Sequence, residues 1–254
     1  MRIFPVLLFL LTQPCLAGQT EWQDVLPDVR MRLVAMPYFG QGHEIAAAIE
    51  IDMPASHKTY WRIPGDGGFS AEIDLSNSQG IDDFYQIWPL PSVETNRSGT
   101  DYVYRGRSFL PFSVLPTAEM EPILEVKAFI GICATVCMPV DVAFELKLND
   151  DDLDSFPQFS KALARIPVPW PFGGAPIESL HSTEQGITVR FNDTVEPRSI
   201  VIADETGRYG SARAGLDGID LPLVSGVPPL SGDRVKIDFE TDIGIYSVEQ
   251  IVLP

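Results

Sequence analysis

Proline and glycine are spread so densely along this chain that long helices have little room to form. The 254 residues include 22 prolines and 20 glycines, and a proline inside a helix removes one backbone hydrogen bond and clashes with the preceding turn. Between these breaks, apolar residues recur at every second position, as at 29–33, 47–51, 69–73 and 126–132, which is typical of strands with one buried face. The sequence therefore predicts an all-β protein, with roughly seven or eight strands of residues 20–150 in an antiparallel sandwich.

The same pattern predicts where the chain divides. Two further strands are expected at 102–110 and 140–148, and an acidic run follows at 149–154. Residues 155–166 are able to form one short helix, whereas 167–174, rich in proline and glycine, are expected to have no regular structure. Alternation then resumes at 186–191, 199–204, 233–239 and 247–253. We predict a first domain at 18–154, a helix and Pro/Gly-rich linker at 155–175, and a smaller β-sandwich-like domain at 176–254.

The first residues have the composition of an export signal. Arg2 precedes an apolar stretch at 3–11, and Cys15-Leu16-Ala17 is a small-x-small cleavage pattern. We predict that 1–17 is a cleaved signal peptide that sends the chain to the periplasm. Cys15 follows Pro14 rather than a small residue, which argues against lipidation. No later segment approaches the ~20 apolar residues that a spanning helix needs, so no transmembrane segment is expected in the mature chain.

Charge and motif content exclude several function classes. The net charge is -17 at pH 7, which repels a phosphate backbone, so nucleic acid is not an expected partner. Nucleophile-elbow, phosphate-loop and dinucleotide-binding motifs are absent from the sequence. The histidines, His43, His57 and His181, have no ligand spacing, and the acidic run at 149–154 lacks the pattern of a calcium loop. Neither a cofactor nor a metal site is expected.

Two cysteines remain after cleavage of the signal, Cys133 and Cys137. Residues four apart on an extended strand are separated by about 13 Å, whereas a disulfide needs Cα atoms within roughly 4.4–6.8 Å, so a bond requires a reversal through 134–136. A ring of about five residues stabilises a fold by only ~2 kcal/mol, and a short ring at a sheet edge is open to thiol exchange. Most such pairs in exported proteins are nevertheless structural bridges, and the spacing leaves both interpretations open.

Several segments taken together resemble a known family. They are Lys58–Gly68, Trp88–Pro91, Tyr102–Tyr104 and Cys133–Pro139. Over roughly residues 25–150, they are similar to the amino-terminal periplasmic domain of the DsbD and ScsB thiol:disulfide interchange proteins, and the spacing of the cysteines is that of the ScsB-like branch. The resemblance implies an immunoglobulin-like sandwich. It also implies a membrane electron-transfer protein as electron donor, expected here to be a separate polypeptide, and a thioredoxin-fold periplasmic protein as acceptor.

The resemblance also implies roles for individual residues. Cys133 and Cys137 match the reactive pair of the family. The segment Asp82–Tyr85 resembles the aromatic, acid-flanked cap that shields this pair in DsbD-type domains, so Phe84 and Tyr85 are candidate cap residues. Adjacent aromatic residues are also common in strands, with one ring in the core and one at the surface. Further candidates for lining the site are Tyr60, Trp61 and Tyr104, with core packing as the alternative for the first two.

These observations favour a thiol:disulfide oxidoreductase of the protein-disulfide reductase type, in which Cys133 and Cys137 alternate between dithiol and disulfide. The alternative is a non-enzymatic envelope protein-binding module whose cysteines close a hairpin. Residues 176–254 are expected to act either as a spacer or as a docking surface.

Overall fold

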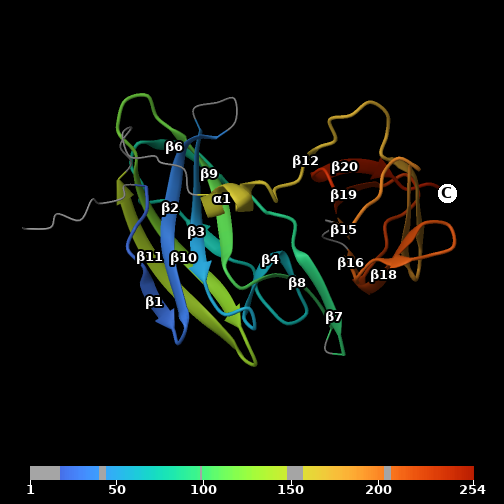
Figure 1. Cartoon of the computed structure of the whole chain (residues 1–254), viewed down its shortest axis with the longest axis horizontal. Coiled ribbons are helices and arrows are strands. Elements are labelled where there is room, and N and C mark those ends of the chain that lie inside the picture. The colour runs from blue at the N-terminus through green and yellow to red at the C-terminus, as the bar shows by residue number, and fades with distance from the viewer. Residues whose placement is uncertain (1–17, 40–43, 98, 148–156, 203–206) are drawn as a thin grey trace, which may run out of the picture.

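The computed structural model describes residues 18–39, 44–97, 99–147, 157–202 and 207–254, and strands make up most of its regular structure (Figure 1). The all-β prediction is confirmed. The predicted signal peptide at 1–17 and the acidic run at 149–154 lie outside the described residues. Figure 1 shows two β units side by side, the first in blue to green and the second in orange to red.

The first unit is an immunoglobulin-like sandwich of two sheets whose neighbouring strands all run antiparallel. One sheet has the order β1 (Gln23–Leu26), β2 (Val29–Phe39), β3 (Glu44–Asp52), β9 (Ser108–Pro116) and β6 (Ile81–Gln86). The other has the order β11 (Cys137–Lys147), β10 (Ile123–Cys133), β4 (Lys58–Gly65), β8 (Gly99–Arg105) and β7 (Ser92–Asn96), and β5 (Glu72–Asp74) pairs with β10.

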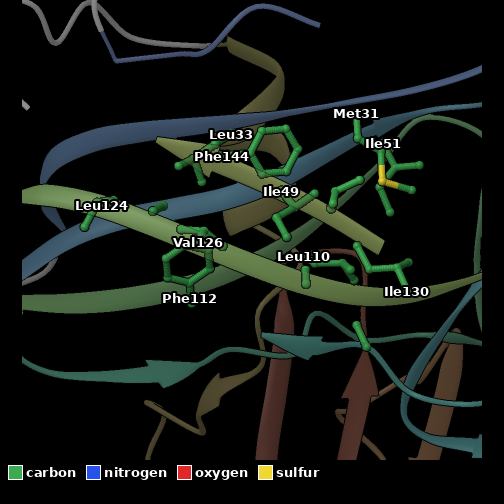
Figure 2. Close-up of a cluster of buried hydrophobic side chains, with 14 of the residues drawn as sticks. Met31, Leu33, Ile49, Ile51, Leu110, Phe112, Leu124, Val126, Ile130 and Phe144 are labelled. Carbon is green, nitrogen blue, oxygen red and sulfur yellow. The ribbon is translucent and has the colours of Figure 1, made fainter. Parts of the chain in front are cut away.

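Alternating apolar side chains fill the space between these sheets (Figure 2). Leu33 of β2, Ile49 of β3 and Phe112 of β9 face Val126 and Ile130 of β10, and all five are fully buried. Each such side chain contributes about 1.5–3 kcal/mol through removal from water. The period-two pattern of the sequence therefore fixes which face of each strand meets the core, and with it the register of the long β10–β11 hairpin.

The first unit contains more strands than the alternation predicts. Eleven strands are described before residue 148, because one predicted segment is divided and further strands, such as β4 and β6, form outside the segments predicted from alternation. The strand predicted at 102–110 is the clearest error: Gly106 has a φ of 62°, which glycine adopts without steric cost, and the chain turns there. β8 thus ends before Gly106, and β9 begins after it in the opposite sheet.

The second unit also has two sheets and a core of its own. One sheet has the order β12 (Val168–Pro169), β20 (Ile245–Ile251), β19 (Arg234–Glu240) and β15 (Ser199–Ile202). The other has the order β13 (Ile177–Thr183), β14 (Gly186–Phe191), β18 (Ile219–Gly226) and β16 (Gly207–Tyr209), with β17 (Arg213–Ala214) paired to β18. Leu180, Val189, Ile237 and Phe239 are among its fully buried residues.

The segment between the units is partly regular. The predicted short helix is present as α1 (Pro157–Leu163), and Phe159 stacks on Phe109 on the outer face of the β3–β9 pair. The expectation of no regular structure at 167–174 is wrong for Val168 and Pro169, which pair in parallel with β20. A proline is tolerated there because β12 is an edge strand. In the described ranges, no helix has the length and apolar character required to span a bilayer.

The two units meet at a small apolar cluster. Trp61, Leu90 and Tyr102 of the first unit pack with Val201 and Ile245 of the second, and all five are buried. The second unit thus covers Trp61 of β4 and Tyr102 of β8, which lie outside the sandwich core of the first unit.

Candidate functional site

The two cysteines lie at the end of the longest hairpin. β10 and β11 pair without interruption from Ile123 opposite Lys147 to Cys133 opposite Cys137. Residues 134–136 reverse the chain, and the Ala134 amide donates to the Val136 carbonyl at 3.2 Å. The Cα atoms of Cys133 and Cys137 lie 4.0 Å apart, and the side chains form a disulfide. The reversal predicted from the spacing is therefore confirmed.

The two sulfur-bearing residues differ in exposure. Cys133 is 1% exposed, and Cys137 is only partly buried. The apolar side chains on either side of Cys137, Val136 and Met138, are 67% and 46% exposed. Cys137 is therefore the cysteine nearer to solvent, and Cys133 lies beneath it.

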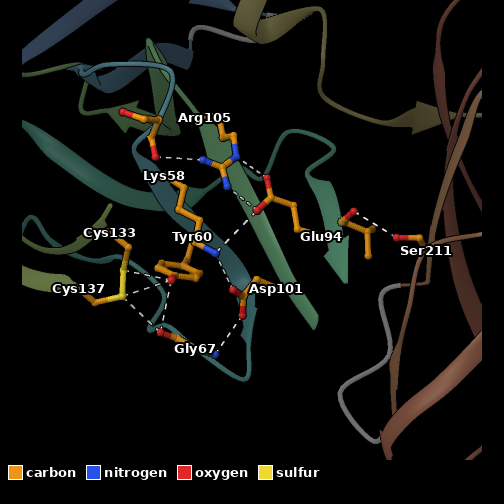
Figure 3. A network of polar contacts seen from close by, with 11 residues as sticks. Lys58, Tyr60, Gly67, Glu94, Asp101, Arg105, Cys133, Cys137 and Ser211 are labelled. Atoms are coloured by element: carbon orange, nitrogen blue, oxygen red, sulfur yellow. Dashed lines mark hydrogen bonds and ion pairs between the residues drawn. A yellow bond between two sulfur atoms is a disulfide. The ribbon is translucent and has the colours of Figure 1, made fainter. Parts of the chain in front are cut away.

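Tyr60 of β4 brings its hydroxyl to the disulfide (Figure 3). Its Oη lies 3.1 Å from the Cys133 Sγ, 3.5 Å from the Cys137 Sγ and 3.3 Å from the Gly67 carbonyl oxygen. Burial, followed by the negative charges of Asp101 and Glu94, raises the pKa of Tyr60 to about 12. The phenol therefore stays protonated at neutral pH and remains a hydrogen-bond donor beside the sulfurs.

A glycine-rich loop between β4 and β5, residues 66–71, lies against the disulfide. The Gly67 carbonyl oxygen is 3.5 Å from the Cys137 Sγ, and the Gly67 amide donates to Asp101 Oδ1 at 3.0 Å. A Cβ atom at Gly68 would come within 2.2 Å of the Tyr60 ring. Only glycine permits this approach, so the loop sequence fits directly over the phenol.

Aromatic packing fixes the other end of this β4–β5 loop. Phe69 stacks on Phe129 of β10, with ring centroids 5.1 Å apart. A Cβ atom at Gly131 would lie 2.9 Å from the Phe69 ring, so the ring occupies the space above that glycine. The loop is thereby anchored on the same strand that carries Cys133.

Charged residues surround Tyr60 on the side away from the cysteines (Figure 3). The Lys58 ammonium is 2.6 Å from Asp101 and 3.8 Å from Glu94, and it lies 5.6 Å from the centre of the Tyr60 ring. Arg105 binds Glu94 through both of its carboxylate oxygens, and this holds the pKa of Glu94 below its usual value. Asp101 therefore has two roles: it binds Lys58, and it holds the amide of the β4–β5 loop.

The remaining predicted site residues make their described contacts elsewhere. Trp61 points to the apolar cluster between the two units. Tyr104 donates its hydroxyl to the Pro89 carbonyl at 2.7 Å and packs between that cluster and the sandwich core. Of the three aromatic residues predicted to line the site, the structure brings Tyr60 to the cysteines.

The candidate cap residues lie on β6, at the edge of the sheet that does not contain the cysteines. Phe84 packs against the sandwich core, whereas Tyr85 is 51% exposed and donates to Glu44 at 2.5 Å. This is the arrangement of an ordinary strand, with one ring inward and one outward.

The residues that lie against the disulfide are those of the β4–β5 loop. The alternation at 69–73 predicts a strand there, which is wrong for 69–71, because β5 begins only at Glu72. The glycines at the start of the loop are the sequence signal that indicates a loop at this position.

Metal-ligating side chains do not cluster in the described part of the chain. No group of three or more His, Cys, Asp or Glu side chains converges there. His57 contacts Ser56 through its Nδ1 at 3.2 Å. The chemistry that the arrangement supports follows from the disulfide and the Tyr60 hydroxyl beside it.

Comparison with known proteins agrees with this chemistry. Residues 24–149 match the family model described as "Thiol:disulfide interchange protein DsbD, N-terminal". No curated protein matches the chain significantly. The chain is similar in structure to the N-terminal periplasmic domain of ScsB from Proteus mirabilis, with a TM-score of 0.69 and 19% identity over 93% of this chain and 99% of that one. The likeness in fold thus extends over both units. Residues 24–149 therefore belong to the DsbD N-terminal family of thiol:disulfide interchange domains.

Proposed function

We propose that this chain is a periplasmic thiol:disulfide oxidoreductase module that carries two electrons in the Cys133–Cys137 pair. The observation that carries the proposal is the asymmetry of the pair: Cys137 is partly exposed, whereas Cys133 is buried beneath a hydrogen-bond donor. A structural bridge has no need of this asymmetry, but an exchange reaction does, because one sulfur must be attacked and the other must leave.

The exchange proceeds through a mixed disulfide. A thiolate of the electron donor attacks Cys137 Sγ, the bond between the two cysteine sulfurs breaks, and Cys133 leaves as a thiolate. The second thiolate of the donor then attacks its own partner sulfur and releases Cys137. The donor is now a disulfide, and the chain holds the two electrons as a dithiol. The same steps in reverse reduce an acceptor disulfide, with Cys137 as the attacking thiolate.

Tyr60 assists the leaving sulfur. Its hydroxyl hydrogen has three acceptors within reach: Cys133 Sγ at 3.1 Å, the Gly67 carbonyl at 3.3 Å and Cys137 Sγ at 3.5 Å. A thiolate accepts more strongly than a disulfide sulfur, so the hydrogen bond to Cys133 strengthens as that sulfur gains charge. Tyr60 thus stabilises the thiolate without giving up its proton.

The family membership and the fold match support the choice of partners. The similar ScsB domain is periplasmic, and the predicted export signal leads to the same compartment. The donor is a membrane electron-transfer protein, and the acceptor is a thioredoxin-fold periplasmic protein. Exposed Val136 and Met138 offer these partners an apolar contact beside Cys137.

Two single-cysteine variants test the proposal. Cys133→Ala leaves the exposed sulfur. Its thiolate is expected to attack rapidly a thioredoxin-fold protein that lacks its resolving cysteine and carries the remaining one as a mixed disulfide with thionitrobenzoate, which then leaves as the free thiolate. Cys137→Ala leaves the buried sulfur and is the matched control, with much slower trapping. Redox titration of the intact pair should give a potential well above about −300 mV.

The alternative, an envelope protein-binding module with a structural hairpin disulfide, predicts the opposite results. Its potential would lie below about −300 mV, and neither variant would trap a partner. Either finding, with the fold intact, would replace the exchange function by a binding function.

A further inference from the structure

The second unit reaches the β4–β5 loop through one arginine. Arg208 of β16 places Nη1 at 2.7 Å from Asp66 Oδ1. Asp66 directly precedes Gly67, whose carbonyl oxygen lies 3.5 Å from Cys137 Sγ. The loop residue that pairs with the second unit is therefore the direct neighbour of the one that lies against the disulfide.

Asp66 is held firmly enough to transmit this contact. Its Oδ2 accepts the Thr100 amide at 3.0 Å, and its own amide donates to the Thr100 carbonyl at 3.1 Å. Gly99 has a φ of 137°, and a Cβ there would lie 2.4 Å from the Asp66 carboxylate. The carboxylate is thus positioned by the start of β8 on one side and by Arg208 on the other.

The residues that follow Arg208 attach the second unit to the same strands. Tyr102 of β8 donates its hydroxyl to the Tyr209 carbonyl at 2.6 Å and accepts the Tyr209 amide at 2.8 Å. Ser211 contacts Thr95 of β7, and the Ser211 amide donates to Thr95 Oγ1 at 3.3 Å. Tyr102 is next to Asp101, which holds the Gly67 amide. The second unit therefore contacts both the β4–β5 loop and the strands β7 and β8.

We propose that Arg208 is a positioning residue, through which the second β unit clamps the β4–β5 loop against the disulfide and limits access to Cys137. This inference rests on the proposed exchange function, and it gives residues 176–254 a role at the site. Release of the Arg208–Asp66 pair lets the loop lift from Cys137 and opens the path for an attacking thiolate.

The clamp is suited to easy release. The two side chains are 38% and 31% exposed, so salt screens their attraction and the pair holds the loop only weakly. A partner that offers its own charged groups to Asp66 or Arg208 would compete directly for the pair.

The test is the rate at which dithiothreitol reduces the disulfide in the folded mature chain, followed by thiol alkylation and mass. Arg208→Ala is expected to speed reduction by about two- to fivefold, the range that a partly exposed ion pair supports. High salt should accelerate the wild type more than the variant, since about 1 M salt shortens the Debye length to about 3 Å and weakens the ion pair that only the wild type has. Arg208→Lys should fall between the two.

Two further variants separate this effect from general destabilisation. Arg190→Ala removes an ion pair with Glu178 inside the second unit and is the matched control, with a wild-type rate. Asp66→Asn removes the charge from the loop side and should match Arg208→Ala, while the double variant should be no faster than either single one. Wild-type rates for Arg208→Ala, equal acceleration in Arg190→Ala, or additive effects in the double variant would each overturn the clamp.

This measurement is independent of the partner assay. Dithiothreitol tests access to Cys137 whether or not a thioredoxin-fold protein exchanges with it. Loss of trapping with the single-cysteine variants would reject the exchange function, whereas an unaltered rate in Arg208→Ala would reject the clamp alone.

Discussion

Tyr60 is the side chain through which the protein acts most directly on its sulfur chemistry. Its hydroxyl is 3.1 Å from Cys133 Sγ, and a hydrogen bond to a charged group contributes about 1.5–3 kcal/mol. Tyr60→Phe should therefore raise the pKa of the Cys133 thiol by about one to two pH units. Thiolate absorbance of the Cys137→Ala variant, with and without Tyr60→Phe, measures the change at Cys133 alone.

Tyr85→Phe is the control for this experiment. The Tyr85 hydroxyl donates to Glu44 within the sheet that lacks the cysteines. Tyr85→Phe therefore removes a phenol hydrogen bond without a change at the cysteines. An equal pKa for the Cys133 thiol with and without Tyr60→Phe would show that the phenol does not support the thiolate.

Burial of the Tyr60 phenol also makes stability depend on pH. The pKa of Tyr60 is about 12 in the folded chain, above the usual value of 10.0, so the folded state holds this proton more tightly than the unfolded state. The resulting stability is present below about pH 10 and is lost as the pH rises towards about 12. Urea unfolding between neutral pH and pH 11 should show a smaller alkaline loss in Tyr60→Phe. Part of the loss should remain, because burial also raises the pKa of Tyr102 and Tyr104.

The β4–β5 loop depends on the absence of a side chain at Gly68. An added Cβ would come within 2.2 Å of the Tyr60 ring. Because that ring is buried and closely packed, it has little room to move away from the clash. Gly68→Ala should therefore displace the loop from the phenol and speed reduction of the disulfide by dithiothreitol. Gly173→Ala is the control, because a Cβ there meets nothing within 4 Å. Equal rates in both variants would contradict a covering role for the loop.

Much of this architecture follows from the period-two pattern. The pattern predicts β2, β3, β10 and β11, because each strand buries one face in a sandwich core and the alternation records that face. It does not show that Gly106 transfers the chain from one sheet to the other, since both flanking segments keep the same alternation. Nor does it predict β12, where two residues pair only because β20 presents an open edge.

The candidate site is predictable to a smaller extent. Cys133 and Cys137 stand out in the sequence because a separation of four residues requires a local chain reversal before they can form a disulfide. The contact between Gly67 and Cys137 joins residues 70 positions apart, and local spacing carries no information about it. The acid-flanked aromatic pair at Phe84 and Tyr85 resembles a cap, yet its edge strand pairs with β9 on the opposite sheet.

Tyr102 of β8 connects the two units through two hydrogen bonds. Its buried hydroxyl bonds both backbone groups of Tyr209, at 2.6 and 2.8 Å, and the net contribution of a hydrogen bond to stability is about 0.5–1.5 kcal/mol. Tyr102→Phe should therefore loosen the second unit from β8 and speed exchange of the Tyr209 amide hydrogen with solvent. Tyr104→Phe is the matched control, because its hydroxyl bonds Pro89 within the first unit. If the apolar cluster around Trp61 holds the units together instead, the Tyr209 amide will keep its wild-type protection in both variants. Apolar packing, and not these hydrogen bonds, would then attach the second unit to the first.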